Sequence, residues 1–146
     1  MAAPVYQDAV LSVATSTTVS ATHVDTSTAV TTGDLLLLIC MSDSGNPGTD
    51  SYVFNTPTGY TQLGASSGNT EDVAVNVFWK IADSGDESGT SITVNHNAGT
   101  DDLMVWHVLV TGNHGSTPIY GAATTCQVSA TVHYWLIVAC RIQCLS

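Results

Sequence analysis

The sequence predicts an all-β fold: an antiparallel β-sandwich of jelly-roll or immunoglobulin-like type in a single domain. Two observations lead to this class. Threonine, serine, valine and glycine dominate the 146 residues, and these residues favour strands and turns over helices. Short apolar runs are separated by clusters of glycine, asparagine, aspartate and proline, and almost nothing recurs with a helical period. The length suits one domain that buries its own core.

Eight strands are expected, each of them a short apolar or alternating run bounded by turn residues. They lie near residues 9–14, 17–24, 34–42, 60–65, 73–82, 90–96, 103–111 and 132–142. Residues 34–42 are apolar on both faces, so this segment should be a central strand that is covered above and below. Residues 103–111 form the second such strand, with His107 as its polar interruption.

The segment 73–82 alternates with a period of two, so one face should be core and the other partly wet. Lys80, one of only two basic residues in the chain, falls on the face expected to be wet. Its stem should cover apolar surface while its ammonium meets one of three acids just beyond the strand. These acids are Asp83, Asp86 and Glu87. Such an exposed pair would contribute at most about 1 kcal/mol; contact with a partner chain is the functional alternative.

The two ends of the chain are expected to differ from the body. Residues 1–8 should form an extended N-terminal arm, and residues 9–146 the β-sandwich domain. The last apolar strand, 132–142, runs almost directly into the C-terminus without a closing turn. Either a neighbouring chain completes the sandwich, or the reading frame stops short of the usual pattern.

Charge narrows the range of partners. The formal net charge is -10, with 12 acidic residues against two basic ones. Nucleic-acid binding depends on Lys and Arg neutralising phosphates, so DNA and RNA are excluded as partners, and anionic membranes are disfavoured. The longest apolar runs fall well short of the ~20 residues of a membrane helix. The N-terminus lacks the features of a secretory signal, so we expect synthesis in a cytoplasm.

Four cysteines are present: Cys40, Cys126, Cys140 and Cys144. They fit no zinc-binding spacing, and in a chain made in a cytoplasm we expect reduced, mostly buried thiols. A contact between Cys40 and Cys140 on neighbouring strands stays open as an alternative.

No catalytic residue is assigned, and the chain is not expected to be an enzyme. The five histidines have no metal-binding spacing, and neither a nucleophile elbow nor a phosphate-binding loop occurs. Ser116 and His114 could in principle join an aspartate in a hydrolase triad, but nothing in the spacing selects them.

No cofactor or metal is assigned either, although two acidic loops offer the oxygen ligands that Ca²⁺ prefers. The first loop holds Asp43, Asn46 and Asp50, and the second holds Asp83, Asp86 and Glu87. Neither matches a known calcium loop, and the turns themselves favour these residue types. Among the aromatics, Trp79, Trp106 and Tyr60 are expected in core or turn packing. The candidates for ligand contact are Tyr52 and Phe54.

Five segments follow one another in an ordered series. They are "GDLLLLIC" (33–40), "TPTGYTQLG" (56–64), "VNVFWKIADSGDES" (75–88), "SITV" (91–94) and "VWHVLVTGNHGSTPI" (105–119). A Gly-Asp pair opens an apolar strand, a Pro-x-Gly-Tyr turn follows, and an aromatic-Lys strand end leads into an acidic loop. This order resembles a recurrent β-sandwich module of tailed bacteriophages, found in capsid decoration or cement proteins and in tail or fibre components.

The resemblance implies a virion structural protein without catalytic residues. Its fold-defining positions would be Gly33, Asp34, Pro57, Gly59, Tyr60, Lys80, Ala82 and Gly112. The expected function is capsid decoration: made in the host cytoplasm, the protein would bind the major capsid protein on the outside of the head and stabilise it. Self-association, as a trimer, is also expected. The alternative is a tail or fibre module that binds host-surface glycan.

Overall fold

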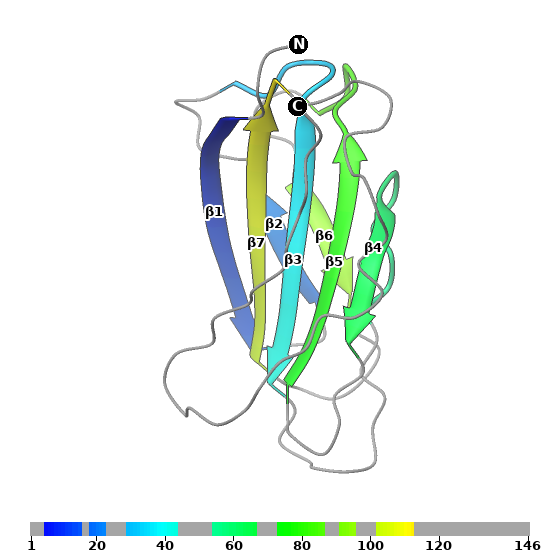
Figure 1. Ribbon diagram of the computed structural model, residues 1–146. Coiled ribbons are helices and arrows are strands. Elements are labelled where there is room, and N and C mark those ends of the chain that lie inside the picture. The colour runs from blue at the N-terminus through cyan, green and yellow to red at the C-terminus, as the bar shows by residue number, and fades with distance from the viewer. Residues whose placement is uncertain are drawn as a thin grey trace.

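The computed structural model describes residues 5–15, 18–22, 29–43, 54–66, 73–86, 91–95 and 102–112. Over these residues the chain forms seven β-strands and no helix, so the all-β class is confirmed (Figure 1). The strands are β1 (Val5–Thr15), β2 (Thr18–Thr22), β3 (Leu35–Asp43), β4 (Thr61–Ser66), β5 (Val73–Ile81), β6 (Ser91–Asn95) and β7 (Asp102–Thr111). The jelly-roll or immunoglobulin-like arrangement stays a prediction.

Five strands form one antiparallel sheet in the order β1-β7-β3-β5-β4, and β2 pairs with β6 in a second, two-stranded sheet. The small sheet lies behind the large one (Figure 1). β3 is central, as its apolar sequence predicts, and β1 and β4 are the edges among the described strands. None of the described residues forms a helix long and apolar enough to cross a bilayer.

The core lies between the two sheets. We call the face of the large sheet that points toward β2 and β6 its inner face, and the opposite face its outer face. Leu36 and Leu38 of β3, Phe78 of β5 and Leu109 of β7 are buried on the inner face, in one cluster with Val94 of β6. Burial of each such side chain contributes about 1.5–3 kcal/mol, so this cluster is the main source of stability.

The ends of β3 and β5 are joined by backbone hydrogen bonds at Gly33, Asp34 and Ala82. Gly33 N donates to Ala82 O (2.9 Å), and Ala82 N donates to Asp34 O (2.8 Å). The Asp34 carboxylate accepts hydrogen bonds from the backbone N and Oγ1 of Thr31. Gly33 has φ 100°, which favours glycine because it has no Cβ. The Gly-Asp pair before β3 is therefore a structural joint.

The segment from Pro57 to Tyr60 is a tight turn leading into β4. Tyr60 N donates to Pro57 O at 3.0 Å. Gly59 has φ 82°, the value that a type II turn requires at its third position. The turn carries the Tyr60 ring into the core cluster.

β1 begins earlier than the expected strand at 9–14. Val5–Asp8, which we expected in the N-terminal arm, already pair with β7. The pairing register shifts between Tyr6 and Asp8, as in a β-bulge, and Gln7 Nε2 donates to Thr111 Oγ1 at 2.9 Å. The bulge adds one unpaired residue to β1, so the strand continues toward the N-terminus although the alternation of its side chains is interrupted. Residues 1–4 and the expected strand 132–142, with the question of its closure, lie outside the described residues.

Candidate functional site

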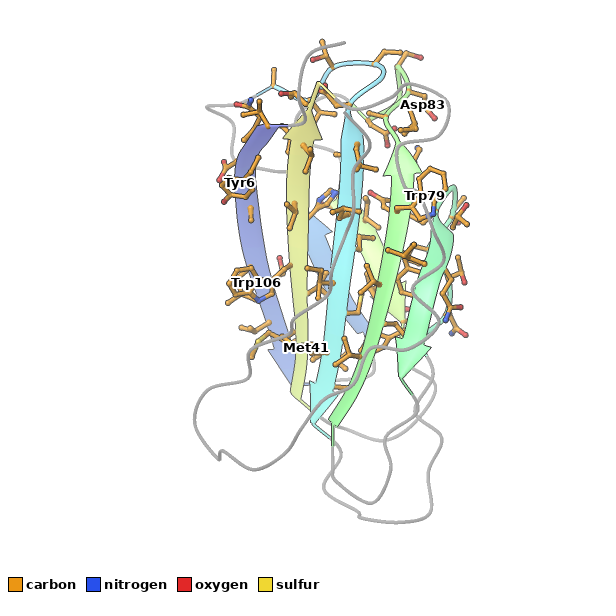
Figure 2. All side chains as sticks on the ribbon, viewed as in Figure 1. Tyr6, Met41, Trp79, Asp83 and Trp106 are labelled. Carbon is orange, nitrogen blue, oxygen red and sulfur yellow. The ribbon has the colours of Figure 1, made fainter. Side chains whose placement is uncertain are left out.

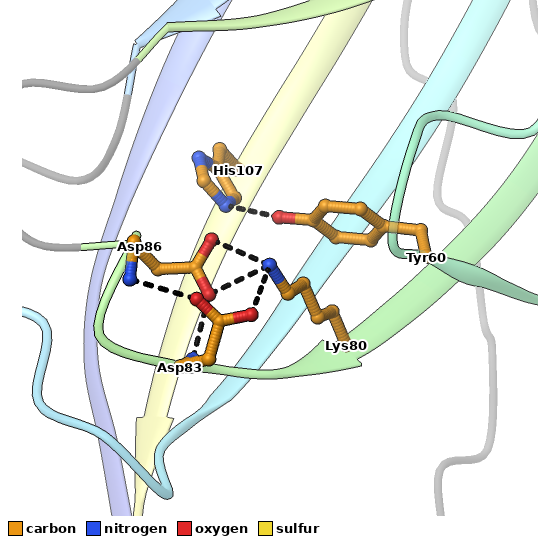
Figure 3. A network of polar contacts seen from close by, with 6 residues as sticks. Tyr60, Lys80, Asp83, Asp86 and His107 are labelled. Atoms are coloured by element: carbon orange, nitrogen blue, oxygen red, sulfur yellow. Dashed lines mark hydrogen bonds and ion pairs between the residues drawn. The ribbon is translucent and has the colours of Figure 1, made fainter.

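The acidic turn after β5 binds Lys80. Its Nζ lies 2.8 Å from each Asp86 carboxylate oxygen and 3.1 Å from Oδ2 of Asp83 (Figure 3). One ammonium therefore meets two carboxylates, as expected from the sequence.

The turn residues hold these carboxylates in place through the backbone. Asp86 N donates to Asp83 O at 3.0 Å, and Asp83 N donates to Asp86 Oδ2 at 2.7 Å. Gly85 N donates to Asp83 Oδ1 at 2.8 Å. Aspartates of this kind commonly close turns by bonding nearby amides. The "DSGD" sequence is thus preorganised around the lysine.

Contrary to the expectation from the sequence, Lys80 does not lie on a solvent-exposed face of β5. Lys80 shares the inner face of β5 with the fully buried Phe78, and its side chain is only 16% exposed. Asp86 is 7% exposed and Asp83 64%. A Cβ at Gly59 would lie 3.4 Å from Lys80 Cε, so the Pro57–Tyr60 turn runs along the lysine stem. The expectation of an exposed pair is wrong for Lys80 and Asp86 and holds only for Asp83.

Electrostatics keeps Lys80 protonated. Burial alone would lower the pKa of Lys80, but the hydrogen bonds that Lys80 donates to Asp86 and Asp83, with the charges of these carboxylates, outweigh it and raise the pKa above the ordinary 10.5. The backbone N–H of Gly85, followed by Lys80, lowers the pKa of Asp83. A lysine that stays charged and fully ion-paired is neither a nucleophile nor a base, so this cluster is built to hold structure.

A second polar pair lies beside this cluster. The hydroxyl of Tyr60 and Nε2 of His107 are 3.2 Å apart, and the two rings meet edge to face (Figure 3). His107 is fully buried, and Tyr60 is nearly so. Burial, with the nearby charge of Asp86, raises the pKa of Tyr60. The polar interruption of β7 therefore has a hydrogen-bond partner inside the core.

The two candidate calcium loops are described by the structure to different extents. In the second loop the carboxylates of Asp83 and Asp86 form ion pairs with Lys80. The described residues contain no group of three or more His, Cys, Asp or Glu able to hold a metal ion. Of the candidates in the first loop, the described residues include only Asp43, the last residue of β3. The other candidates, Asn46, Asp50, Glu87, Ser116 and His114, lie outside the described residues.

For two of the aromatic residues, the burial in the structure is the opposite of what the sequence predicted. Phe54, expected to contact a ligand, is 1% exposed in the core cluster, so that expectation is wrong. Trp106, expected in the core, is 42% exposed on the outer face of β7. Trp79 is partly buried, and Tyr60 packs over its turn as expected. Tyr52 lies outside the described residues.

An exposed apolar patch was not anticipated from the sequence. It lies on the outer face of β1 and β7, where Leu11 pairs with Trp106 and Val13 pairs with Met104 (Figure 2). We call it the β1–β7 patch; its members are Tyr6, Leu11, Val13, Met104 and Trp106, which are 38–65% exposed. The sequence signal that could have revealed the patch is that β7 is apolar on both faces. The patch lies where β7 is next to an edge strand. The same face is buried farther along the sheet, at Leu35, Leu37, Val75 and Val77.

Compared with known proteins, the chain matches no protein-family model, no curated protein and no solved structure. Its function is therefore to be inferred from the described residues and their chemistry.

Proposed function

We propose that the protein is a non-enzymatic virion structural protein, a capsid decoration or cement protein that binds the outer surface of the major capsid protein. The observation that carries this proposal is the β1–β7 patch. Contiguous exposed apolar surface rimmed by polar residues is typical of protein–protein contact sites. A sheet face is also a rigid platform for such a contact.

The composition of the patch suits a protein partner. Trp106 and Tyr6 belong to the residue types that dominate interface energetics. Covering the exposed half of Leu11, which is 47% exposed, adds about 1 kcal/mol before the entropic cost of association. None of the five members carries a charge, although the chain as a whole has a net charge of -10. Docking through these five side chains therefore buries no carboxylate of their own.

The motif residues support the likeness to phage modules in a different way. Gly33, Asp34 and Ala82 tie together the ends of two strands. Gly59, Tyr60 and Lys80 pack a turn against the acidic loop. Each of these residues has a structural role in the described part of the chain, which agrees with the expectation that the shared motifs define a fold and not an active site.

Co-sedimentation with purified, expanded heads of the encoding phage tests the proposal. Wild-type protein should pellet with heads and raise their resistance to heat. A Tyr6→Ser/Trp106→Gln variant, shown by urea denaturation to be folded, should lose at least tenfold in affinity. Gln62→Ser, an exposed change on β4, is the control and should bind as the wild type does. Failure of the folded wild type to bind heads would contradict the proposal.

The second candidate is a tail or fibre module that binds host-surface glycan. The observation in its favour is that two aromatic side chains, Tyr6 and Trp106, are exposed on one face, since sugars stack on aromatic rings. Against it, Tyr6 pairs with Val110, which lies four residues along β7 from Trp106. At ~3.3 Å per residue this is roughly 13 Å, too far for one sugar ring to contact both. Binding to host cells but not to heads would favour this candidate.

A further inference from the structure

We propose that two copies of the chain pair antiparallel through the outer edges of their β1 strands, with Leu11 of one protomer opposite Val13 of the partner subunit. The starting observation is the state of that edge. β1 is 11 residues long, and across the described strands it pairs only with β7. A long, regular edge strand offers a row of N–H and C=O groups to another strand.

The edge lacks the usual protection over its straight section. Proteins block edges with lysine, proline, bulges or charged side chains. In β1 the bulge and the one charge, at Asp8, both lie at the N-terminal end. From Ala9 to Thr15 the strand "AVLSVAT" contains no charge and no proline. Among the described strands, this section is therefore the part of β1 that is unblocked and unpaired on its outer edge.

Backbone direction selects the residues that pair. The Asp8 carboxylate accepts the hydrogen bond from Ala9 N at 2.7 Å. Because the backbone groups of an antiparallel strand alternate in direction, those of Leu11 and Val13 point the same way as those of Ala9. The side chains of Leu11 and Val13, 47% and 65% exposed, lie on the outer face. In a register with Leu11 opposite Val13 of the partner subunit, the backbone N–H and C=O groups of both residues find hydrogen-bond partners in both copies.

A second copy is the occupant of this edge because it brings an identical section, residues 9–15, which is uncharged and, among the described strands, paired on one side only. Each copy carries a net charge of -10, so association needs an uncharged contact. The section 9–15 supplies one on both sides. In the proposed register Asp8 lies beyond the overlap, and the Asp8 residues of the two copies are roughly 26 Å apart, outside the Debye length of about 8 Å. The two Asp8 carboxylates therefore do not repel each other at close range.

Pairing would also enlarge the patch. Leu11 lies beside Trp106 in the register of β1 and β7. A two-fold axis at Ser12 places the patches of the two copies on one face of a continuous sheet. This two-fold contact goes beyond capsid binding and differs from the trimer that the resemblance implies.

Sedimentation equilibrium of the free protein tests the pairing without any capsid. Wild type should approach twice the 15.2 kDa chain mass as concentration rises. Val13→Lys should weaken association at least tenfold, because it sets a charge opposite Leu11 of the partner subunit. Val5→Lys adds the same charge at an exposed position outside the overlap and should associate as the wild type does. A wild type that stays monomeric at about 1 mM would overturn the proposal, as would equal effects of the two lysines.

Cross-linking tests the register and does not depend on Val13→Lys folding. Leu11→Cys and Val13→Cys proteins are oxidised separately and as an equal mixture, and dimers are compared on a non-reducing gel. Opposite residues lie about 5.5 Å apart, which suits a disulfide, whereas identical positions are diagonal at about 7–8 Å. The mixture should form several times more dimer than either protein alone. Equal yields in all three samples would overturn the register.

One outcome separates this contact from the proposed function. If the wild type is monomeric and Val13→Lys abolishes binding to heads, a strand of the capsid protein occupies the edge, and the self-pairing is wrong while capsid binding stands. If the wild type dimerises but does not bind heads, the pairing stands and the capsid function is wrong.

Discussion

Lys80 and Asp86 form an ion pair on the inner face of the sheet, with Nζ 2.8 Å from each carboxylate oxygen. Both side chains are largely shielded, while the second carboxylate, from Asp83, faces solvent. The scarce positive charge of the chain is therefore placed where it neutralises the carboxylate that the turn after β5 buries. This relationship sets the first two predictions.

Replacing Lys80 with Met should lower the free energy of unfolding by about 3 kcal/mol. Removing one partner of a shielded pair leaves the other charge buried, which costs about 3–5 kcal/mol, and the partial exposure of Lys80 favours the lower end. Urea denaturation of the two proteins measures the difference.

Two variants control this measurement. Asp83→Asn should destabilise much less than Lys80→Met, because the Asp83 carboxylate is largely exposed. Lys80→Met/Asp86→Leu should recover much of the loss, because it removes both charges together. A loss of less than about 1 kcal/mol in Lys80→Met would contradict the buried pair and restore the interpretation as a surface contact.

The contribution of Lys80 should depend on pH at both extremes. The pKa of Lys80 is raised above 10.5, so its stabilisation is complete below that value and is lost as pH rises through the folded-state pKa. The pKa of Asp83 is lowered below 3.8, so its stabilisation is present above that value and is lost as pH falls through the folded-state pKa.

The difference in unfolding free energy between wild type and Lys80→Met should therefore be constant from about pH 5 to pH 9 and shrink outside this range. Urea denaturation across the pH series measures it. A difference that changes steadily between pH 6 and 8 would mean that another group controls the pair.

Replacing Asn76 with Leu should raise the free energy of unfolding by about 1 kcal/mol or more. Among the described residues, the side-chain N and O atoms of Asn76 are buried without a hydrogen-bond partner. An apolar side chain of similar size removes that desolvation penalty. Asn55→Leu, at an exposed position, is the control and should give no gain. A loss of stability in Asn76→Leu would show that the amide is satisfied within the fold.

Cys40 should be inert in the folded protein. It is a free, buried thiol, and burial raises its pKa to about 12. Since the thiolate is the reactive form, iodoacetamide at pH 8 should label Cys40 only after urea is added. Mass spectrometry of the peptide that contains Cys40 reports this labelling. Rapid labelling of the native protein would mean that the inner face opens readily to solvent.

Most of the strands followed from the sequence. Seven of the eight expected strands are found, because β-strand alternation and turn residues are local signals. The central position of β3 followed from its two apolar faces. The early start of β1 could not be predicted in the same way, since a bulge at Gln7 interrupts the alternation.

The candidate site was predicted less completely. The contact of Lys80 with its acidic turn is local and followed from spacing, but its burial did not. The alternation of β5 predicted that the face of Lys80 would be partly wet, but both faces are buried, at Val75 and Val77 on one side and at Asn76 and Phe78 on the other. The exposure of Trp106 could not be predicted because β7 is apolar on both faces, so its sequence does not say which face the small sheet covers.

The location of the protein in an electron-microscopy map of the phage particle tests the central claim most directly. Capsid decoration predicts density for this fold on the outside of the head, with the β1–β7 patch against the major capsid protein. Density in the tail or a fibre, or a head surface without it, would contradict the claim.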